Sequence, residues 1–345
     1  MQTLPPIARL LAAITLAIGG VAILLFGLPR EFRFFSSEFT FQKRSSLSPK
    51  DPAFPILSSY FPIQKIDRYA AQIQGGGSFA VDIAEYKKNG LTRKAQVFLE
   101  NEAGSAGLPY PADSGRSLAW REATQFIQQI PDKEAVFLSW WDNAQRIELF
   151  TGANSWVAAP SAAAFESAQE AFWNEVSGGF VNPNTALRDL AAWYLSDADS
   201  ALQSVIEQFG ETGHLYFLLS LDDLARLSEM KSLSGLSIPF ETRVFAPEPD
   251  IHRLISGVKR WAREKGNGSY LLQPLGHLGV RVWRITNSAG EKTLLARLLP
   301  FTSSLANPLA KLELIHRSNP SALISIYRWN TPTSRSKSAP SIPTR

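Results

Sequence analysis

The chain has 345 residues, of which 45% are hydrophobic and 19% charged, a composition typical of a folded protein. Its formal net charge of +4 comes from 35 Lys and Arg against 31 Asp and Glu, without a basic stripe suited to phosphate backbones, so we expect no nucleic-acid partner. The absence of cysteine excludes disulfides, thiolate chemistry, cysteine-bound metals and covalent c-type haem attachment.

Residues 10–28 form an apolar run without a charged side chain. As a helix rising 1.5 Å per residue, this run would span about 30 Å, the thickness of a hydrocarbon core. The alternative is a cleaved secretory signal, but its apolar region is shorter and ends at a small-residue cleavage site. The sequence therefore favours an uncleaved single-pass transmembrane anchor over residues 7–28. Charge counting on its two flanks does not fix the orientation.

Three further segments follow the predicted anchor. Residues 29–62, rich in Phe, Ser and Pro, are expected to form an extended stalk, and residues 331–345 a disordered tail. Between them, residues 63–330 are expected to form one α/β globular domain. Near its beginning, Asn89-Gly90 lies between two β-capable segments, which predicts a type I′ hairpin.

From Pro109 onward, predicted helices alternate with short apolar strands. Strands separated by helices favour a largely parallel sheet with helices on both faces, to which β-hairpins are added. The predicted helices cover residues 117–130, 143–150, 161–176, 185–195, 197–209, 249–266 and 291–299. The predicted strands cover residues 135–141, 155–159, 214–221, 270–273, 280–285, 311–318 and 322–329, of which the last two form a closing hairpin.

Few side chains stand in patterns that carry chemistry. The four histidines lack metal-binding spacing, and no nucleophile elbow or phosphate-binding glycine loop occurs. The acidic pairs Asp197/Asp199 and Asp222/Asp223 open predicted helices, where capping is the ordinary role of a carboxylate. We therefore expect no metal, no cofactor and no self-sufficient catalytic site.

One tetrapeptide, Ser-Trp-Trp-Asp at residues 139–142, directly follows the first predicted parallel strand. Such sheets bind ligands at the carboxyl ends of their strands, and two indoles beside a carboxylate offer a flat apolar surface with hydrogen-bonding groups. The candidate binding residues are Trp140, Trp141, Asp142 and Arg146. In the competing structural interpretation, Asp142 and Gln145 form a capping box and both tryptophans are core residues.

Two families resemble this sequence. The order strand, Trp140-Trp141-Asp142, helix resembles the extracytoplasmic C-terminal domain of oligosaccharyltransferase catalytic subunits, in which a Trp-Trp-Asp-Tyr-Gly motif recognises the acceptor hydroxyl. This chain has Asn143-Ala144 in place of Tyr-Gly and shows no multi-helix membrane domain. The overall layout and the phrase FLSWWDNAQRIELFTG at residues 137–152 are similar to HaoB, a family of hydroxylamine-oxidation accessory proteins of ammonia- and methane-oxidising bacteria.

The resemblance to HaoB implies a single-pass inner-membrane protein whose globular domain faces the periplasm. It also implies a partner, the multihaem hydroxylamine oxidoreductase, and a non-catalytic role exercised through protein–protein contact. The resemblance to oligosaccharyltransferases implies the alternative, a peptide- or glycan-recognition module with Trp140, Trp141 and Asp142 as its acceptor pocket.

Overall fold

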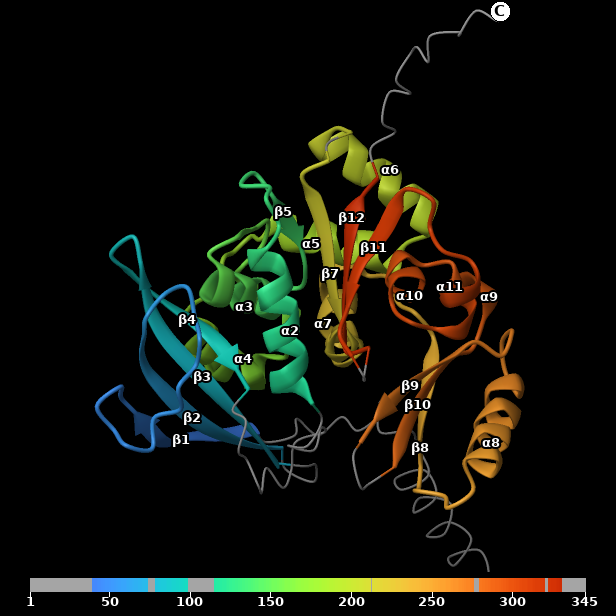
Figure 1. Cartoon of the computed structure of the whole chain (residues 1–345), viewed down its shortest axis with the longest axis horizontal. Coiled ribbons are helices and arrows are strands. Elements are labelled where there is room, and N and C mark those ends of the chain that lie inside the picture. The colour runs from blue at the N-terminus through green and yellow to red at the C-terminus, as the bar shows by residue number, and fades with distance from the viewer. Residues whose placement is uncertain are drawn as a thin grey trace, which may run out of the picture. The chain divides into compact units, whose positions relative to one another are not determined.

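The structure, a computed structural model, describes residues 39–73, 78–98, 115–211, 213–275, 279–319 and 322–330. These residues form three β-sheets and the helices packed on them (Figure 1). The predicted anchor, residues 7–28, and the predicted tail, residues 331–345, lie outside the described residues. No described helix is both long and apolar enough to cross a membrane. The transmembrane helix of the predicted fold class is therefore not found among the described residues.

The first sheet is antiparallel and follows the chain order β1-β2-β3-β4. Its strands are β1 (Phe39–Leu47), β2 (Ile63–Ile73), β3 (Ser78–Lys88) and β4 (Leu91–Val97). Asn89 and Gly90 connect β3 to β4 with φ angles of 51° and 78°, the left-handed pair of a type I′ turn, so the predicted hairpin is confirmed. β1, which pairs with β2, comes from the segment predicted to be a stalk.

The second sheet has five strands in the order β11-β12-β7-β5-β6. They are β5 (Val136–Leu138), β6 (Asn154–Ser155), β7 (Leu215–Ser220), β11 (Leu312–Arg317) and β12 (Ile324–Trp329). β5 pairs in parallel with β6 and β7, whereas β12 runs antiparallel to both β7 and β11. Every residue of β7 is buried, as its continuous apolar sequence indicates.

The predicted largely parallel sheet is therefore wrong: two of the three described sheets are antiparallel throughout, and the third is mixed. The alternation of helices and strands on which that prediction rested holds only between residues 116 and 220, where it produces β5, β6 and β7. Strands joined by a short connection fold back on each other, as β3 with β4 and β11 with β12 do. Hairpin pairing consequently dominates the fold.

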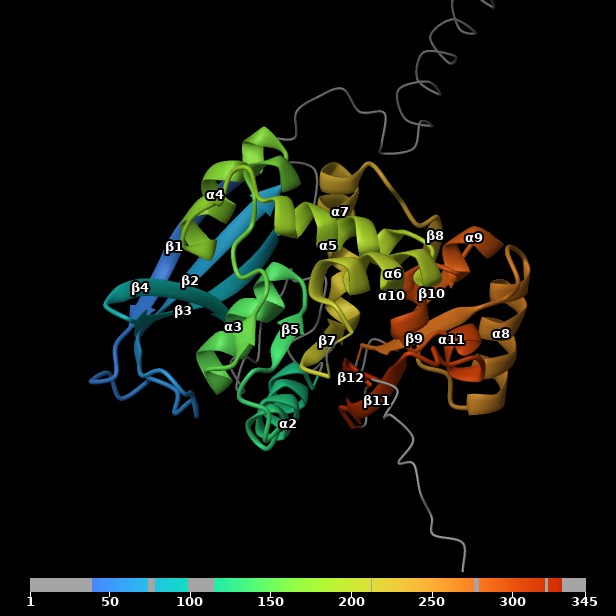
Figure 2. The ribbon, with the colours of Figure 1, turned by 90° about the horizontal axis from the view of Figure 1, so that it is seen from above.

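Besides the helix described below with the third sheet, helices pack on all three sheets and on one another. They are α2 (Arg116–Gln128), α3 (Trp141–Thr151), α4 (Ser167–Ser177), α5 (Thr185–Leu195), α6 (Ala198–Phe209), α7 (Leu227–Ser234), α9 (Ser288–Glu291), α10 (Leu294–Leu298) and α11 (Thr302–Ala306), with the 3₁₀ helices η2 (Ala162–Ala164) and η3 (Leu221–Arg226). α2 packs on β11 and β12, and α3 contacts β4 and β6. α4 lies over the first sheet, where it contacts β1 and β4 (Figure 2).

The third sheet is antiparallel, in the order β8-β10-β9, and α8 (Ile251–Arg263) lies along one of its faces (Figure 1). Its strands are β8 (Phe240–Phe245), β9 (Tyr270–Pro274) and β10 (Val280–Ile285). Val258 and Trp261 of α8 pack on Val282 in a small core of their own. Trp283 and Ile285 point to the opposite face and join the main core, which also includes side chains of the first two sheets. All three sheets thus share one continuous apolar interior.

Candidate functional site

The candidate residues lie at the carboxyl end of β5, where Trp140 has an extended backbone and α3 begins at Trp141. Because β7 runs parallel to β5, the chain leaving β7 reaches the same edge of the sheet. There it forms η3 and the start of α7, which bring Arg226 and Glu229 to the candidate residues.

Both indoles donate to a single carboxylate oxygen. Trp140 Nε1 and Trp141 Nε1 lie 3.1 and 3.0 Å from Glu229 Oε2, while Arg226 donates to Glu229 Oε1 over 2.8 Å. Trp140 is fully buried, and Trp141 is 2% exposed. The interpretation of the two tryptophans as core residues is therefore confirmed, and their polar N–H groups are satisfied inside the core.

Asp142 lies between two arginines. Its Oδ2 accepts from Arg146 over 3.1 Å and from Arg226 over 3.2 Å, and its Oδ1 accepts from the backbone N–H of Asn143 over 2.9 Å. Burial alone would raise the pKa of Asp142, but the two guanidinium groups outweigh this effect and lower the pKa below its ordinary value. The side chain is thus held as a buried carboxylate.

Arg146, the fourth candidate residue, is buried as deeply as Asp142 and 2% exposed. Its guanidinium carbon lies 4.8 Å from the ring centre of Phe98 and 5.0 Å from that of Trp120. It also donates to Asn143 Oδ1 over 2.6 Å and to the backbone carbonyl of Gln96 over 3.1 Å. Burial lowers the pKa of Arg146, and Asp142 provides its opposing charge.

A third buried carboxyl group, that of Asp223, lies next to Asp142 and Arg146 and is joined to them through Asn143. Asp223 accepts from Asn143 Nδ2 and from the backbone N–H of Ser220, each over 2.8 Å. Burial, and then the charge of Asp142, raise the pKa of Asp223 well above its ordinary value. We call the whole set the Asp142 cluster: Trp140, Trp141, Asp142, Asn143, Arg146, Asp223, Arg226 and Glu229.

The four predicted residues are therefore brought together, but their polar groups bind other side chains and backbone groups of the same chain. A ligand hydroxyl or amide would have to displace Arg146 or Arg226 from Asp142, or Glu229 from the indoles. A ligand-binding role of Trp140, Trp141, Asp142 and Arg146 stays a prediction, and in this conformation the cluster's own geometry joins β5, α3, η3 and α7.

The predicted capping box of Asp142 and Gln145 is wrong, because α3 begins two residues earlier than that interpretation requires. Trp140 is the N-cap residue and makes no side-chain cap, while Gln145 donates to the carbonyls of Ala158 and Ser177 over 3.0 and 2.9 Å. Capping is confirmed for Asp223, which forms a capping box with Ser220. Asp222 instead pairs with Arg116 at 2.7 Å.

Sequence reasoning missed Arg226 and Glu229, although they complete the cluster. The sequence pattern that could have indicated these two residues is a pair of opposite charges three residues apart, shortly after a buried strand. That spacing is common on solvent-exposed helices, where such pairs contribute little. Nothing in the pattern distinguishes it from an ordinary surface pair.

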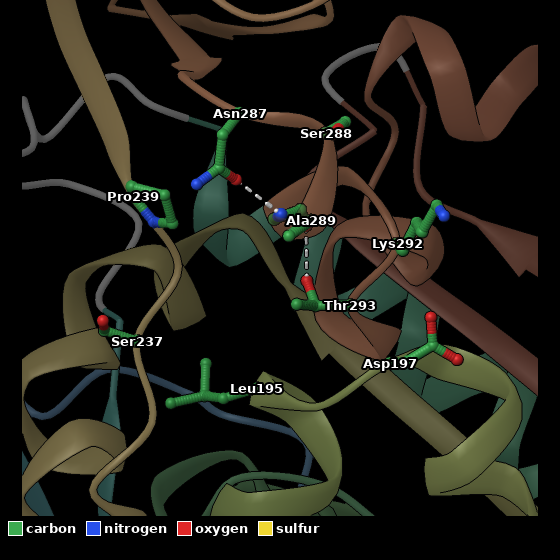
Figure 3. A pocket seen from close by; sticks show the side chains of 10 residues that line it. Leu195, Asp197, Ser237, Pro239, Asn287, Ser288, Ala289, Lys292 and Thr293 are labelled. Carbon is green, nitrogen blue, oxygen red and sulfur yellow. Dashed lines mark hydrogen bonds between the residues drawn. The ribbon is translucent and has the colours of Figure 1, made fainter.

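A pocket of about 370 Å³ opens elsewhere, and none of the Asp142 cluster lines it (Figure 3). Asn287 and Thr293 turn their oxygens to the backbone of Gly290, with Asn287 Oδ1 accepting from its N–H and Thr293 Oγ1 donating to its carbonyl, each over 2.7 Å. The exposed Asp197 and Lys292 flank the opening. Among the described residues, no group of three or more metal-binding side chains could hold an ion.

Comparison with known proteins gives a family but no close curated relative. Among the curated proteins, none matches this chain significantly. The C-terminal globular domain of an oligosaccharyltransferase from Archaeoglobus fulgidus is a similar solved structure, at 12% identity and a TM-score of 0.32, covering 62% of this chain and 97% of that domain. At this TM-score the likeness carries no argument about function. Residues 6–329 match the family described as HaoA-associated protein HaoB. Because that match covers nearly the whole chain, the chain belongs to the HaoB family of HaoA-associated proteins.

Proposed function

We propose that the protein is a non-catalytic accessory of hydroxylamine oxidation that acts by binding HaoA. The observation that carries the proposal is membership of the HaoB family over residues 6–329, which supports an accessory role in this process. We infer that HaoA is the multihaem hydroxylamine oxidoreductase. The protein would then supply contacts to that enzyme and leave the redox chemistry to its haems.

Two features support the non-catalytic part of the proposal. The sequence has no cysteine with which to attach c-type haem or to provide a thiolate. In the Asp142 cluster, Asp142 and Glu229 are engaged by Arg146, Arg226 and the indole N–H groups, and Asp223 accepts from Asn143 and the backbone of Ser220. All three carboxyl groups are buried, which makes them poor candidates for a general base acting on a substrate. Both features fit a protein that works through its surface.

The location is also a proposal: the inner membrane, with the globular part in the periplasm. The uncharged apolar residues 10–28 of the sequence support membrane attachment. Protease added to spheroplasts should digest the globular part, and washing membranes with alkaline carbonate should leave the intact chain in the pellet. Recovery of the full chain in the soluble fraction would contradict this location.

The direct test of the function mixes the purified full-length chain, kept in detergent, with purified HaoA. Size-exclusion chromatography with light scattering should show a complex heavier than either protein, and hydroxylamine should be turned over only in samples that contain HaoA. Separate elution at micromolar concentrations would contradict the binding role. Turnover by the chain alone would contradict the non-catalytic role.

A further inference from the structure

The outward face of α8 is basic. The buried side chains of the helix, Val258, Trp261 and Ala262, mark the side that packs on the third sheet. At about 100° per residue, the opposite side presents residues three and four apart along the helix. Apart from Ser256, all residues on that side are basic and exposed: His252, Arg253, Lys259, Arg260 and Arg263, which we call the α8 basic face.

No acid interrupts this face, since residues 251–263 contain neither Asp nor Glu. The acids at its two ends are engaged: Asp250 accepts from the backbone N–H of His252 over 2.9 Å and lies 3.7 Å from Arg253 of the face, and Glu264 lies 3.2 Å from Arg284. Within the described part of the chain, Lys259, Arg260 and Arg263 have no carboxylate at ion-pairing distance. Their charges are therefore available to a partner.

Helix stability explains only part of the pattern. Arg260 and Arg263 lie in the last turn of α8, where the helix dipole favours cations, but Arg253 lies in the first turn, where the dipole disfavours them. Lys259 and Arg263 are four residues apart and Arg260 and Arg263 three apart, spacings at which like charges repel. Recognition of negative charge accounts for cations that are kept at these unfavourable spacings.

Apolar surface borders the basic face. Ile251 and Ile255 are 56% and 40% exposed along one flank of α8. Exposed apolar side chains beside cations are typical of a protein–protein interface, in which apolar contact supplies affinity and charge supplies orientation. A membrane-surface helix instead buries its apolar face among lipids, whereas that of α8 packs on Val282 of the third sheet. The geometry therefore favours a protein over a bilayer.

We propose that the α8 basic face, with Ile251 and Ile255 at its edge, is the surface on which an acidic patch of the partner protein docks. This inference rests on the proposed function for the partner's identity, HaoA. It adds the region of this chain that makes the contact and the charge that the partner must present there.

The test compares four full-length proteins in titrations against purified HaoA at two salt concentrations. The first is wild type, and the second carries Lys259→Glu, Arg260→Glu and Arg263→Glu. The third is a matched control, Lys50→Glu, Lys87→Glu and Lys133→Glu, which changes the net charge equally at exposed positions outside α8. A neutral variant, Lys259→Gln with Arg260→Gln and Arg263→Gln, shows whether the charge rather than helix folding is responsible, and circular dichroism checks all four proteins.

The α8 charge reversal should raise Kd at least about tenfold, the neutral variant should lie between it and wild type, and the control should stay within about twofold. The difference between wild type and the α8 reversal should shrink at high salt, because screening weakens exposed charges. Equal HaoA binding by the α8 reversal and the control would overturn the docking surface while leaving the proposed function intact.

Absence of HaoA binding by wild type would overturn both proposals together. Vesicles of phosphatidylglycerol and phosphatidylethanolamine, titrated with the same proteins, provide the second arm. If the α8 reversal abolished vesicle binding and left HaoA binding unchanged, a lipid surface and not a protein would be the occupant of the face.

Discussion

At the scale of single residues, Asp142 is the group whose environment is most unusual. Its carboxylate is 4% exposed and faces Arg146 and Arg226. Removing its charge leaves the buried Arg146 without its ion-pair partner, whereas Arg226 keeps Glu229 at 2.8 Å. That two adjacent tryptophans are buried could be predicted from the apolar strand before them. Their acceptor, Glu229, could not, because it lies 89 and 88 residues away in the sequence and only the fold brings it near.

Asp142→Asn should lower the free energy of unfolding at pH 7 by about 3–5 kcal/mol, the usual cost of breaking a buried ion pair. The control, Asp189→Asn, removes an exposed partner of Arg188 and should cost under about 1 kcal/mol. Urea unfolding of full-length proteins measures both. A loss of ligand or HaoA binding by Asp142→Asn at unchanged stability would instead support the predicted binding role of Asp142.

The same variant has a defined pH dependence. Because the pKa of Asp142 is lowered in the folded state, its stabilisation is present above the unfolded-state value, near 3.8, and is lost as the pH falls through the lower folded value. The stability difference between wild type and Asp142→Asn should therefore be constant from pH 7 to 5 and shrink below pH 3.8. A difference that already shrank between pH 7 and 5 would contradict the assignment.

His214 has a raised pKa because its Nδ1 hydrogen-bonds with Asp132 Oδ2 at 2.9 Å. An NMR titration should place its midpoint above the ordinary 6.5, and Asp132→Asn should lower it. Any stabilisation by this exposed contact is present below pH 6.5 and lost as the pH rises through the folded midpoint. Glu134→Gln, which removes a more distant carboxylate, should have the smaller effect, and an unshifted midpoint in Asp132→Asn would refute the contact.

At the scale of elements, sequence periodicity succeeded where one face of an element is buried. The helix over 185–195 and the strand over 280–285 have the predicted bounds, and the closing hairpin is confirmed as β11 and β12. β1 was not predicted as a strand because its inner residues are exposed and supply no alternating apolar pattern. The predicted helix over 291–299 is shorter, with α10 at Leu294–Leu298, because Thr293 and Leu299 on either side of it have extended backbones.

A substitution at Gly279, which leads into β10, tests how closely the chain approaches β8 in the third sheet. Its φ is 101°, and a Cβ there would lie 2.1 Å from the backbone oxygen of Phe245 in β8. Gly279→Ala should cost about 3 kcal/mol or more, because both the left-handed backbone and the clash with β8 oppose it. The control is Gly235→Ala, with φ of 73° and open space around a Cβ, which should cost about 1–2 kcal/mol. Equal losses in thermal unfolding would contradict this close approach of the chain at Gly279 to β8.

At the scale of the whole molecule, local patterns predicted most elements but not how the strands pair. The connection between two strands decides whether they run parallel. Between β7 and β12 the chain forms the whole third sheet, β8, β9 and β10, with α8, before it returns to the second sheet. The return strand β12 pairs antiparallel with β7. Such long-range pairing depends on how the parts pack together, which a pattern of apolar residues along the chain does not encode.

The proposed function draws on the same level of organisation. The chain belongs to a family of HaoA-associated proteins, the Asp142 cluster joins β5 to η3 and α7, and α8 presents cations to the solvent. We propose that the protein acts through contact with HaoA.

Crosslinking in living cells with a lysine-reactive reagent, followed by mass spectrometry, tests that contact most directly. The account predicts crosslinked peptides that join lysines of this chain to HaoA and disappear when the gene for either protein is deleted. If HaoA is abundant in the same cells and this chain crosslinks reproducibly to other proteins but never to HaoA, the account is contradicted.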